Sequence, residues 1–319
     1  MFRDSIIYLS KAKWAQRMII SWEIARRAAS RFVAGNSIDD AIRVVRGLHE
    51  KGINSTLDHL GESTETRDEA IKATEDILEL LEQIHNSNIS ANVSIKLTQI
   101  GLALDEGFCE RNLEKILEHA REHANFIRID MEDTPYTEQT LRMYQKMRKK
   151  NFLNTGVVVQ SYLYRTENDT RLLLKEDSRI RLVKGAYKEP PEAAFPKKGD
   201  VDENFDALSR IIIDAIKHAG SPILSEDGLI PPILAIGSHD PKRIEYAKNY
   251  ANNVGILKKA IEFQMLYGIR RDLQEHCRQE GYPVRVYVPY GTHWYPYYMR
   301  RLAERPANVW FFISNFFRN

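Results

Sequence analysis

The chain has 319 residues, of which 43% are hydrophobic, and this suits one large domain or two ordinary ones with a substantial buried core. Lys and Arg total 46 against 44 acidic residues, and no long basic block or repeated aromatic–basic pattern occurs, so the composition argues against nucleic-acid binding. No run of about 18 apolar residues appears, so a membrane-spanning helix is not expected. The two cysteines, Cys109 and Cys277, fit no metal-binding or CxxC spacing and indicate a reducing compartment.

The N-terminal stretch is basic. Residues 1–33 carry seven Lys or Arg against two acidic residues, a balance that is also typical of an amphipathic transit peptide. A secretory signal is not expected, because charges interrupt every candidate apolar run. Trp and Ile residues between positions 14 and 24 supply apolar surface for packing. We therefore predict that residues 1–50 form an N-terminal helical segment packed on the main domain.

From residue 51 onwards, short runs rich in β-branched residues alternate with longer runs at helical spacing, such as 67–85 and 202–219. Eight strand–helix units predict a parallel sheet closed into a TIM-type (β/α)8 barrel over residues 51–319. A doubly wound open sheet is the competing fold, but no glycine-rich phosphate turn follows the first strand. The candidate strands are 53–61, 91–97, 126–132, 155–163, 179–187, 232–239, 260–266 and 284–291.

Nearly every candidate strand finishes with a residue that can ionise or form a hydrogen bond. Taken singly, a strand-end Lys or Asp is more often part of a structural ion pair. Active sites of this fold lie at the C-terminal ends of the strands, however, so we expect these side chains to converge on one rim. They are Asp58, Glu62, Lys96, Asp130, Gln160, Lys184, Tyr187, His239, Gln264 and Tyr287.

The segment 294–304 sets two adjacent arginines among aromatic residues. If it is helical, Tyr297, Arg300, Arg301 and Glu304 share one face. One interpretation is a solvated face with an Arg300–Glu304 pair, and the other is a helix that presents guanidiniums to an anion. Because the segment follows the eighth strand after a short turn, its polar face can cover the same rim.

The chemistry of the rim is narrowed by missing motifs and by charge. Neither HxH nor HExxH occurs, which gives a catalytic metal little support, and the GxSxG nucleophile elbow is absent. Lys96 and Lys184 would suit a Schiff-base lyase acting on a small carboxylate substrate, and this alternative stays open. Against it, the rim has an excess of cations that need one or more anionic ligands: Lys96, Arg181, Lys184, Arg300 and Arg301. A substrate carboxylate would account for some of that charge, and a cofactor pyrophosphate would account for more.

Several segments resemble the proline dehydrogenases, flavoenzymes that oxidise L-proline to 1-pyrroline-5-carboxylate. YYMRRLAERPANV is similar to the family signature, and the other similar segments, in family order, are VSIKLTQIG, IRIDMED, VVVQSYLYRT, RLVKGAY, SHD, EFQMLYG and RVYVPYG. The resemblance covers roughly residues 50–310 and points to the compact monofunctional bacterial members. One departure is Lys188, where bifunctional relatives tend to carry an aromatic residue.

The resemblance implies a distorted (β/α)8 barrel with non-covalent FAD at the strand C-termini. It implies Asp130 and Arg181 as catalytic residues, with Arg181 near flavin N5, and Glu62 as a gate that pairs with Arg300. The implied substrate-binding residues are Lys96, Leu266, Tyr287, Tyr297, Arg300 and Arg301. The implied FAD-binding residues are Met131, Gln160, Val183, Lys184, Gly185, Ala186, Ser238, His239 and Glu304.

The resemblance also implies a place in metabolism and a set of partners. The reaction would be the first step of proline degradation to glutamate, with electrons passed on to a quinone. The protein is expected in the cytoplasm, where its basic N-terminal helices could contact the inner face of an anionic membrane.

Adjacent helical residues point about 100° apart, so Arg300 and Arg301 cannot approach a carboxylate in the same way. We expect Arg301 to be the more buried anchor for the substrate and Arg300 to be a movable clamp.

Overall fold

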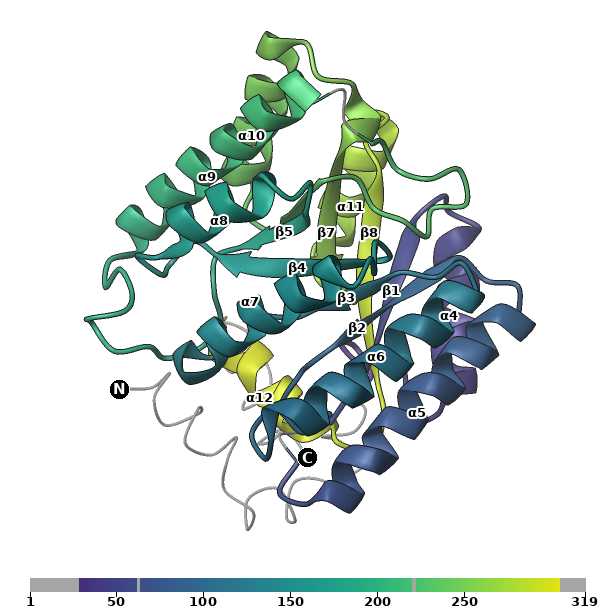
Figure 1. The fold of residues 1–319 in the computed structure, drawn as a ribbon. Helices are drawn as coiled ribbons and strands as arrows, with labels where there is room; N and C mark the ends of the chain where they lie inside the picture. Colours follow the sequence, from purple (N-terminus) through teal and green to yellow (C-terminus); the bar gives the residue numbers. More distant parts are fainter. Residues whose placement is uncertain (1–28, 62–63, 220–221, 305–319) are drawn as a thin grey trace, which may run out of the picture.

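Eight parallel strands form a closed barrel in the computed structural model, which describes residues 29–61, 64–219 and 222–304 (Figure 1). Each strand pairs with the next, and β8 pairs with β1 to close the sheet. The predicted (β/α)8 barrel is therefore confirmed. The strands are β1 Asn54–His59, β2 Ala91–Ile95, β3 Ile127–Ile129, β4 Thr155–Gln160, β5 Arg179–Val183, β6 Leu234–Gly237, β7 Ile261–Leu266 and β8 Val284–Tyr290.

Helices alternate with the strands and surround the barrel (Figure 1). The α5 helix shows why: Thr66 and Glu69 form a capping box at its start, and its apolar side chains Ile77, Leu80 and Leu81 are buried. A short 3-10 helix, Lys258–Ala260, precedes β7. The helices are α4 Ile38–His49, α5 Arg67–Asn86, α6 Glu106–Glu122, α7 Thr134–Lys149, α8 Thr166–Leu174, α9 Lys198–Ala219, α10 Pro241–Val254, α11 Arg271–Gln279 and α12 Trp294–Glu304.

The barrel departs from regular order where its two ends meet. The α4 helix, which precedes β1, packs against both β1 and β8. This is the place that the helix after β8 takes in a regular barrel. The α12 helix is thereby released to lie at an end of the barrel (Figure 1). The α4 helix belongs to the predicted N-terminal segment 1–50. The proposed division at residue 50 itself stays a prediction, and residues 1–28 lie outside the described part of the chain.

The apolar core includes fully buried strand residues, and charged side chains are buried in the barrel as well. Leu57, Val93 and Ile129 are fully buried in the core. Arg285 and Glu262 are also buried and form an ion pair with 2.9 Å between Nε and Oε2. Within the described residues, no helix combines the length and the apolar composition that are needed to cross a bilayer.

Candidate active site

The carboxylate of Asp130 is the meeting point of four strands. Asp130 lies directly after β3, and its Oδ1 accepts hydrogen bonds from Ser94 Oγ at 2.7 Å and from Arg181 Nη1 at 2.9 Å. The Tyr287 hydroxyl donates to Oδ2 at 2.7 Å. The Lys96 amine is 3.7 Å from Oδ2. These residues come from the ends of β2, β3, β5 and β8, so the predicted convergence on one rim occurs around this carboxylate.

Lys96 is held by a second carboxylate. Its amine donates to both oxygens of Asp58, at 2.9 and 3.1 Å, and Asp58 is only 1% exposed. Burial alone would lower the pKa of Lys96, but the carboxylates of Asp58 and Asp130 outweigh it and hold that pKa above its ordinary value. Lys96 is therefore a fixed cation at the rim.

Arg181, on β5, is oriented by a side chain of β7, the next strand but one in the barrel. Its Nε donates to Gln264 Oε1 at 2.5 Å, and its guanidinium carbon lies 5.4 Å from the centre of the Tyr287 ring. Gln264 in turn donates to Glu262, which is paired with Arg285. Among the described residues, Arg181 donates hydrogen bonds through Nε and Nη1.

The α12 helix brings its aromatic and cationic face to this rim. Tyr297 is 6% exposed and Arg301 is 9% exposed, and the Arg301 guanidinium carbon lies 5.2 Å from the centre of the Tyr297 ring. Arg300 is only half-buried, which agrees with the expectation that Arg301 is the more buried of the two. Burial raises the pKa of Tyr187 to about 12, and the charges that act on it include Arg300, Lys96 and Asp130. Arg300 therefore lies near the cluster around Asp130.

Most of the residues implied in FAD binding lie at or just after the ends of β4, β5 and β6, whereas Met131 follows β3 and Glu304 is on α12. Gln160 ends β4 and donates to the Glu132 carbonyl at 2.9 Å. Ser238 Oγ accepts from the Asp240 amide at 3.1 Å. His239 Nε2 accepts from the Leu266 amide at 2.9 Å, which puts the proton of a neutral ring on Nδ1. Met131 is buried, whereas Val183, Ala186 and Leu266 are half-buried.

Two of the predicted residues are not placed by the described structure. Glu62, the expected gate, lies outside the described residues. The backbone of Glu304 belongs to α12, but its side chain is not described. The gate and the FAD contact of Glu304 therefore stay predictions.

Gly185 closes the turn after β5 in a conformation that favours glycine. Its φ is +118°, and a Cβ there would lie 2.5 Å from the Tyr162 ring. A side chain would force Tyr162 and the strand-end loop apart. Glycine therefore keeps this turn packed against Tyr162, at the end of the strand whose following residues are implied in FAD binding.

We expect Gly185→Ala to lower the flavin content of the purified protein and to destabilise it by about 1–3 kcal/mol, because alanine is strained at this φ. Gly199→Ala is the matched control, because a Cβ at Gly199 meets nothing within 4 Å. The measurements are flavin absorbance per protein and thermal unfolding. Equal flavin content in both variants would contradict a role for this turn in cofactor binding.

Neither rim lysine has the surroundings of a Schiff-base nucleophile. Such a lysine needs a lowered pKa, and the pKa of Lys96 is raised. The Lys184 amine is held between Asp202 and Asp240, with 2.7 Å to Asp240 Oδ2. Each amine is thus engaged by two carboxylates, so the lyase alternative is not favoured.

Sequence reasoning missed Glu132, which lies two residues beyond Asp130. Its Oε1 accepts from the Thr98 amide at 3.1 Å and its Oε2 from the Thr98 hydroxyl at 2.5 Å. Burial raises the pKa of this carboxyl. Glu132 thus ties the loop after β3 to the loop after β2 and holds Asp130 and Lys96 in register. Its signal in the sequence was its place in the segment IRIDMED.

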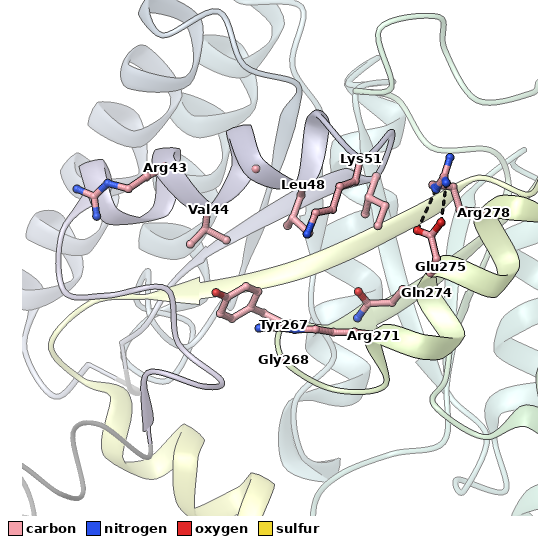
Figure 2. A pocket seen from close by; sticks show the side chains of 12 residues that line it. Arg43, Val44, Leu48, Lys51, Tyr267, Gly268, Arg271, Gln274, Glu275 and Arg278 are labelled. Atoms are coloured by element: carbon pink, nitrogen blue, oxygen red, sulfur yellow. Dashed lines mark hydrogen bonds and ion pairs between the residues drawn. The ribbon is translucent and has the colours of Figure 1, made fainter.

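A cavity of about 650 Å³ lies elsewhere, on the flank of the barrel. Figure 2 shows it between α4 and α11, with Arg43 at one end, the Arg278–Glu275 ion pair at the other, and Tyr267 between them. Its lining includes the cations Arg43, Lys51 and Arg271 but none of the predicted site residues. This cavity is therefore separate from the cluster at the strand ends.

Comparison with known proteins decides the family. A family model described as proline dehydrogenase matches residues 41–313. The chain belongs to the proline dehydrogenase family. It is 39% identical over 309 residues to proline dehydrogenase 2 of Bacillus subtilis (strain 168), which covers 97% of this chain and 96% of that protein. It is also 39% identical over 320 residues to the proline dehydrogenase of Deinococcus radiodurans, covering 98% and 97% of the two chains.

More distant members of the family are longer. The bifunctional protein PutA of Escherichia coli is 26% identical, and the match covers 90% of this chain but 24% of that protein. The crystal structure of proline utilization A from Bdellovibrio bacteriovorus, inactivated by N-propargylglycine, superposes with a TM-score of 0.79 at 24% identity, covering 88% of this chain and 33% of that one. This likeness supports the fold, and the near-full-length matches to shorter relatives confirm the monofunctional type.

Proposed function

We propose that the protein oxidises L-proline to 1-pyrroline-5-carboxylate, the first step of proline degradation to glutamate, with a non-covalently bound FAD as hydride acceptor. The observation that carries the proposal is the near-full-length similarity to two proline dehydrogenases. The described geometry supports it, because Lys96 and Arg181 meet at Asp130 and the half-buried Arg300 acts on Tyr187 beside the same cluster. Several cations gathered at one rim suit an anionic substrate.

The substrate carboxylate is gripped from two sides in this proposal. Arg300 and Arg301 approach it from α12, and the ammonium of Lys96 approaches it from the end of β2. Each charge-assisted hydrogen bond contributes about 1.5–3 kcal/mol, enough to fix one end of a small ring. Tyr287, Tyr297 and Leu266 then form the wall against the five-membered ring. A small rigid substrate held at two ends has little freedom left to lose before reaction.

Asp130 and Arg181 lie at the other end of the proposed substrate site, where the reaction takes place. Asp130 aligns Arg181 through a 2.9 Å ion pair and fixes Tyr287 through its other oxygen. Gln264 prevents rotation of the guanidinium by accepting from Nε. When bound, FAD supplies the hydride-accepting chemistry. The residues that would hold it are Met131, Gln160, Val183, Lys184, Gly185, Ala186, Ser238, His239 and Glu304.

We expect kcat/KM for L-proline to rise with pH between 6 and 9, by up to about tenfold per pH unit. The reason is that the ring carbon next to the nitrogen becomes a good hydride donor only when the substrate amine has lost its proton. The pKa of Lys96 is raised and that of Tyr187 is about 12, so neither group titrates in this window. The control is Lys96→Arg, whose charge is permanent: its overall rate falls, but the shape of the profile should persist. A flat profile for the parent would contradict the proposal.

Colour tests the proposed function directly. The purified protein should be yellow, with a flavin spectrum that bleaches on anaerobic addition of L-proline. Borohydride in the presence of substrate should trap no covalent adduct on Lys184. A colourless protein without affinity for FAD, or a trapped lysine adduct, would refute the proposal and favour the lyase.

The electron acceptor is proposed to be a quinone, reached by peripheral contact of the basic N-terminal segment with the inner face of an anionic membrane. The expected result is binding to anionic vesicles at low salt that weakens as salt is added, since screening shortens electrostatic range. Neutral vesicles are the control. If the protein binds neither anionic nor neutral vesicles, membrane contact is contradicted.

A further inference from the structure

Three side chains with metal-binding atoms meet between α5 and α6. Nε2 of His119 is 3.2 Å from Glu82 Oε1, and Nε2 of His123 is 3.3 Å from the same oxygen. The three ligand atoms all lie within 4.8 Å of one another. His119 lies in the last turn of α6 and His123 caps the end of that helix, four residues on, a spacing that lets two imidazoles share one ion.

The separations agree with a tetrahedral coordination shell. Zinc binds imidazole nitrogen and carboxylate oxygen at about 2.0–2.1 Å, so neighbouring ligand atoms around it are roughly 3.3 Å apart. Both separations from Glu82 Oε1 have this value, at 3.2 and 3.3 Å. Two of the three separations therefore suit a zinc ion, and the two imidazole nitrogens lie within 4.8 Å of each other.

The surroundings supply an outer shell and a further ligand. Glu122 Oε2 lies 3.4 Å from Nδ1 of His119, the carboxylate–histidine arrangement that fixes the tautomer of a metal-binding ring. His85 follows Glu82 by one turn on α5, and its ring centre is 4.6 Å from that of His123. His85 or a water would complete the shell. The His119 and His123 side chains are 22% and 16% exposed, so an ion can reach them from solvent.

The electrostatic setting favours a cation. The cluster lies at the C-terminal ends of α5 and α6, where the helix dipoles are negative. A second group of similar composition, Glu245, His276 and Glu280, provides a contrast. There the amine of Lys248 already bridges the two carboxylates. Among the described residues, the ion pairs of Glu82 are to histidines only.

We propose that Glu82, His119 and His123 form a binding site for a divalent transition metal of the zinc type, which clamps α5 to α6. A ligand set of two imidazoles and one carboxylate binds Zn²⁺ in preference to Mg²⁺ or Ca²⁺. The helix ends that carry the cluster precede β2 and β3, whereas Lys96 and Asp130 follow those strands. The site is thus on the opposite end of the barrel from the rim, and its role is structural.

The test is a zinc titration of the tag-free, metal-stripped full-length flavoprotein, followed by calorimetry and thermal unfolding. We expect one equivalent of Zn²⁺ to bind and to raise the Tm by about 3–5 °C at a concentration near one hundred times Kd, while kcat stays unchanged. His119→Ala and Glu82→Gln should abolish both effects, and Mg²⁺ should produce neither.

His276→Ala is the matched control, because it removes a histidine from the group that Lys248 already neutralises. This variant should bind zinc as the parent does. The proposal is overturned if the parent binds no zinc, or if zinc binding survives in His119→Ala and is lost in His276→Ala. Because the readouts are binding and Tm, they stand apart from the activity proposed above.

Discussion

Replacing Arg301 with lysine is expected to lower kcat/KM for L-proline by about 2–4 kcal/mol, roughly 30- to 900-fold, without loss of bound flavin. Arg301 is 9% exposed and its guanidinium stacks on Tyr297 at 5.2 Å. A lysine offers a point charge in place of a planar fork and cannot reproduce the stacking. The substrate carboxylate would then lack bonds in a site from which water is largely excluded.

Arg300→Lys is the matched control, because it makes the same change one residue away. Arg300 is only half-buried, so water can replace part of what is lost. We expect a smaller loss, mostly in KM. The measurements are steady-state kinetics with L-proline and a quinone or dye acceptor, together with flavin content. If both variants stay within about twofold of the parent, the polar face of α12 is only a solvated surface.

Local periodicity predicts where the strands lie but not where they end. The candidate strand 126–132 shortens to Ile127–Ile129 in the structure. Asp130 and Glu132 follow it in a loop because their carboxylates bind Arg181 and Thr98, contacts that the local pattern does not contain. The residues that shorten the strand are therefore the residues of the site, where tertiary contacts override strand propensity.

The ion pair beneath the site was readable in part. Glu262 and Gln264 alternate along β7, and Arg285 and Tyr287 alternate along β8, so each pair points to one face of its strand. Two successive polar residues on the same face of a buried strand indicate a network of hydrogen bonds inside the barrel. Which residue pairs with which depends on the register between β7 and β8, which places Gln264 opposite Arg285. The sequence of a single strand does not contain that register.

The position of the last helix shows the same limit on a larger scale. The sequence predicts a helix after β8, and α12 is found there. Its release from the outer layer depends on α4, which packs on β1 and β8 although it precedes the barrel in sequence. The apolar face of α4 is evident from its spacing, but its partner is a strand more than 200 residues away. This replacement gives Arg301 its place over the strand ends.

Replacing Arg285 with methionine is expected to reduce the free energy of unfolding by about 3–5 kcal/mol, because it leaves the Glu262 charge buried without its partner. Arg285 and Glu262 are 1% and 0% exposed. Arg285 also donates to the carbonyls of Ser55 at 2.8 Å and Gly228 at 2.5 Å. The measurement is unfolding by denaturant: the free energy of unfolding is obtained from the midpoint concentration and from the slope of the free energy against denaturant concentration.

Arg128→Met is the matched control for that change. Arg128 is an equally buried arginine in the barrel, but its hydrogen bonds within the described residues go to the backbone carbonyls of Val157 and Arg179 and not to a carboxylate. Its replacement should therefore cost less than that of Arg285. A double variant, Arg285→Met with Glu262→Leu, should recover part of the stability, since no unpaired charge remains.

The same pair reaches the active site through one intermediary. Glu262 accepts from Gln264, and Gln264 accepts from Nε of Arg181 at 2.5 Å. Arg285→Met should consequently lower kcat more than KM in the fraction that stays folded, because Arg181 loses its fixed orientation while the carboxylate clamp on α12 is untouched. If Arg285→Met unfolds no more easily than Arg128→Met and keeps the parent kcat, the buried pair neither stabilises the barrel nor positions Arg181.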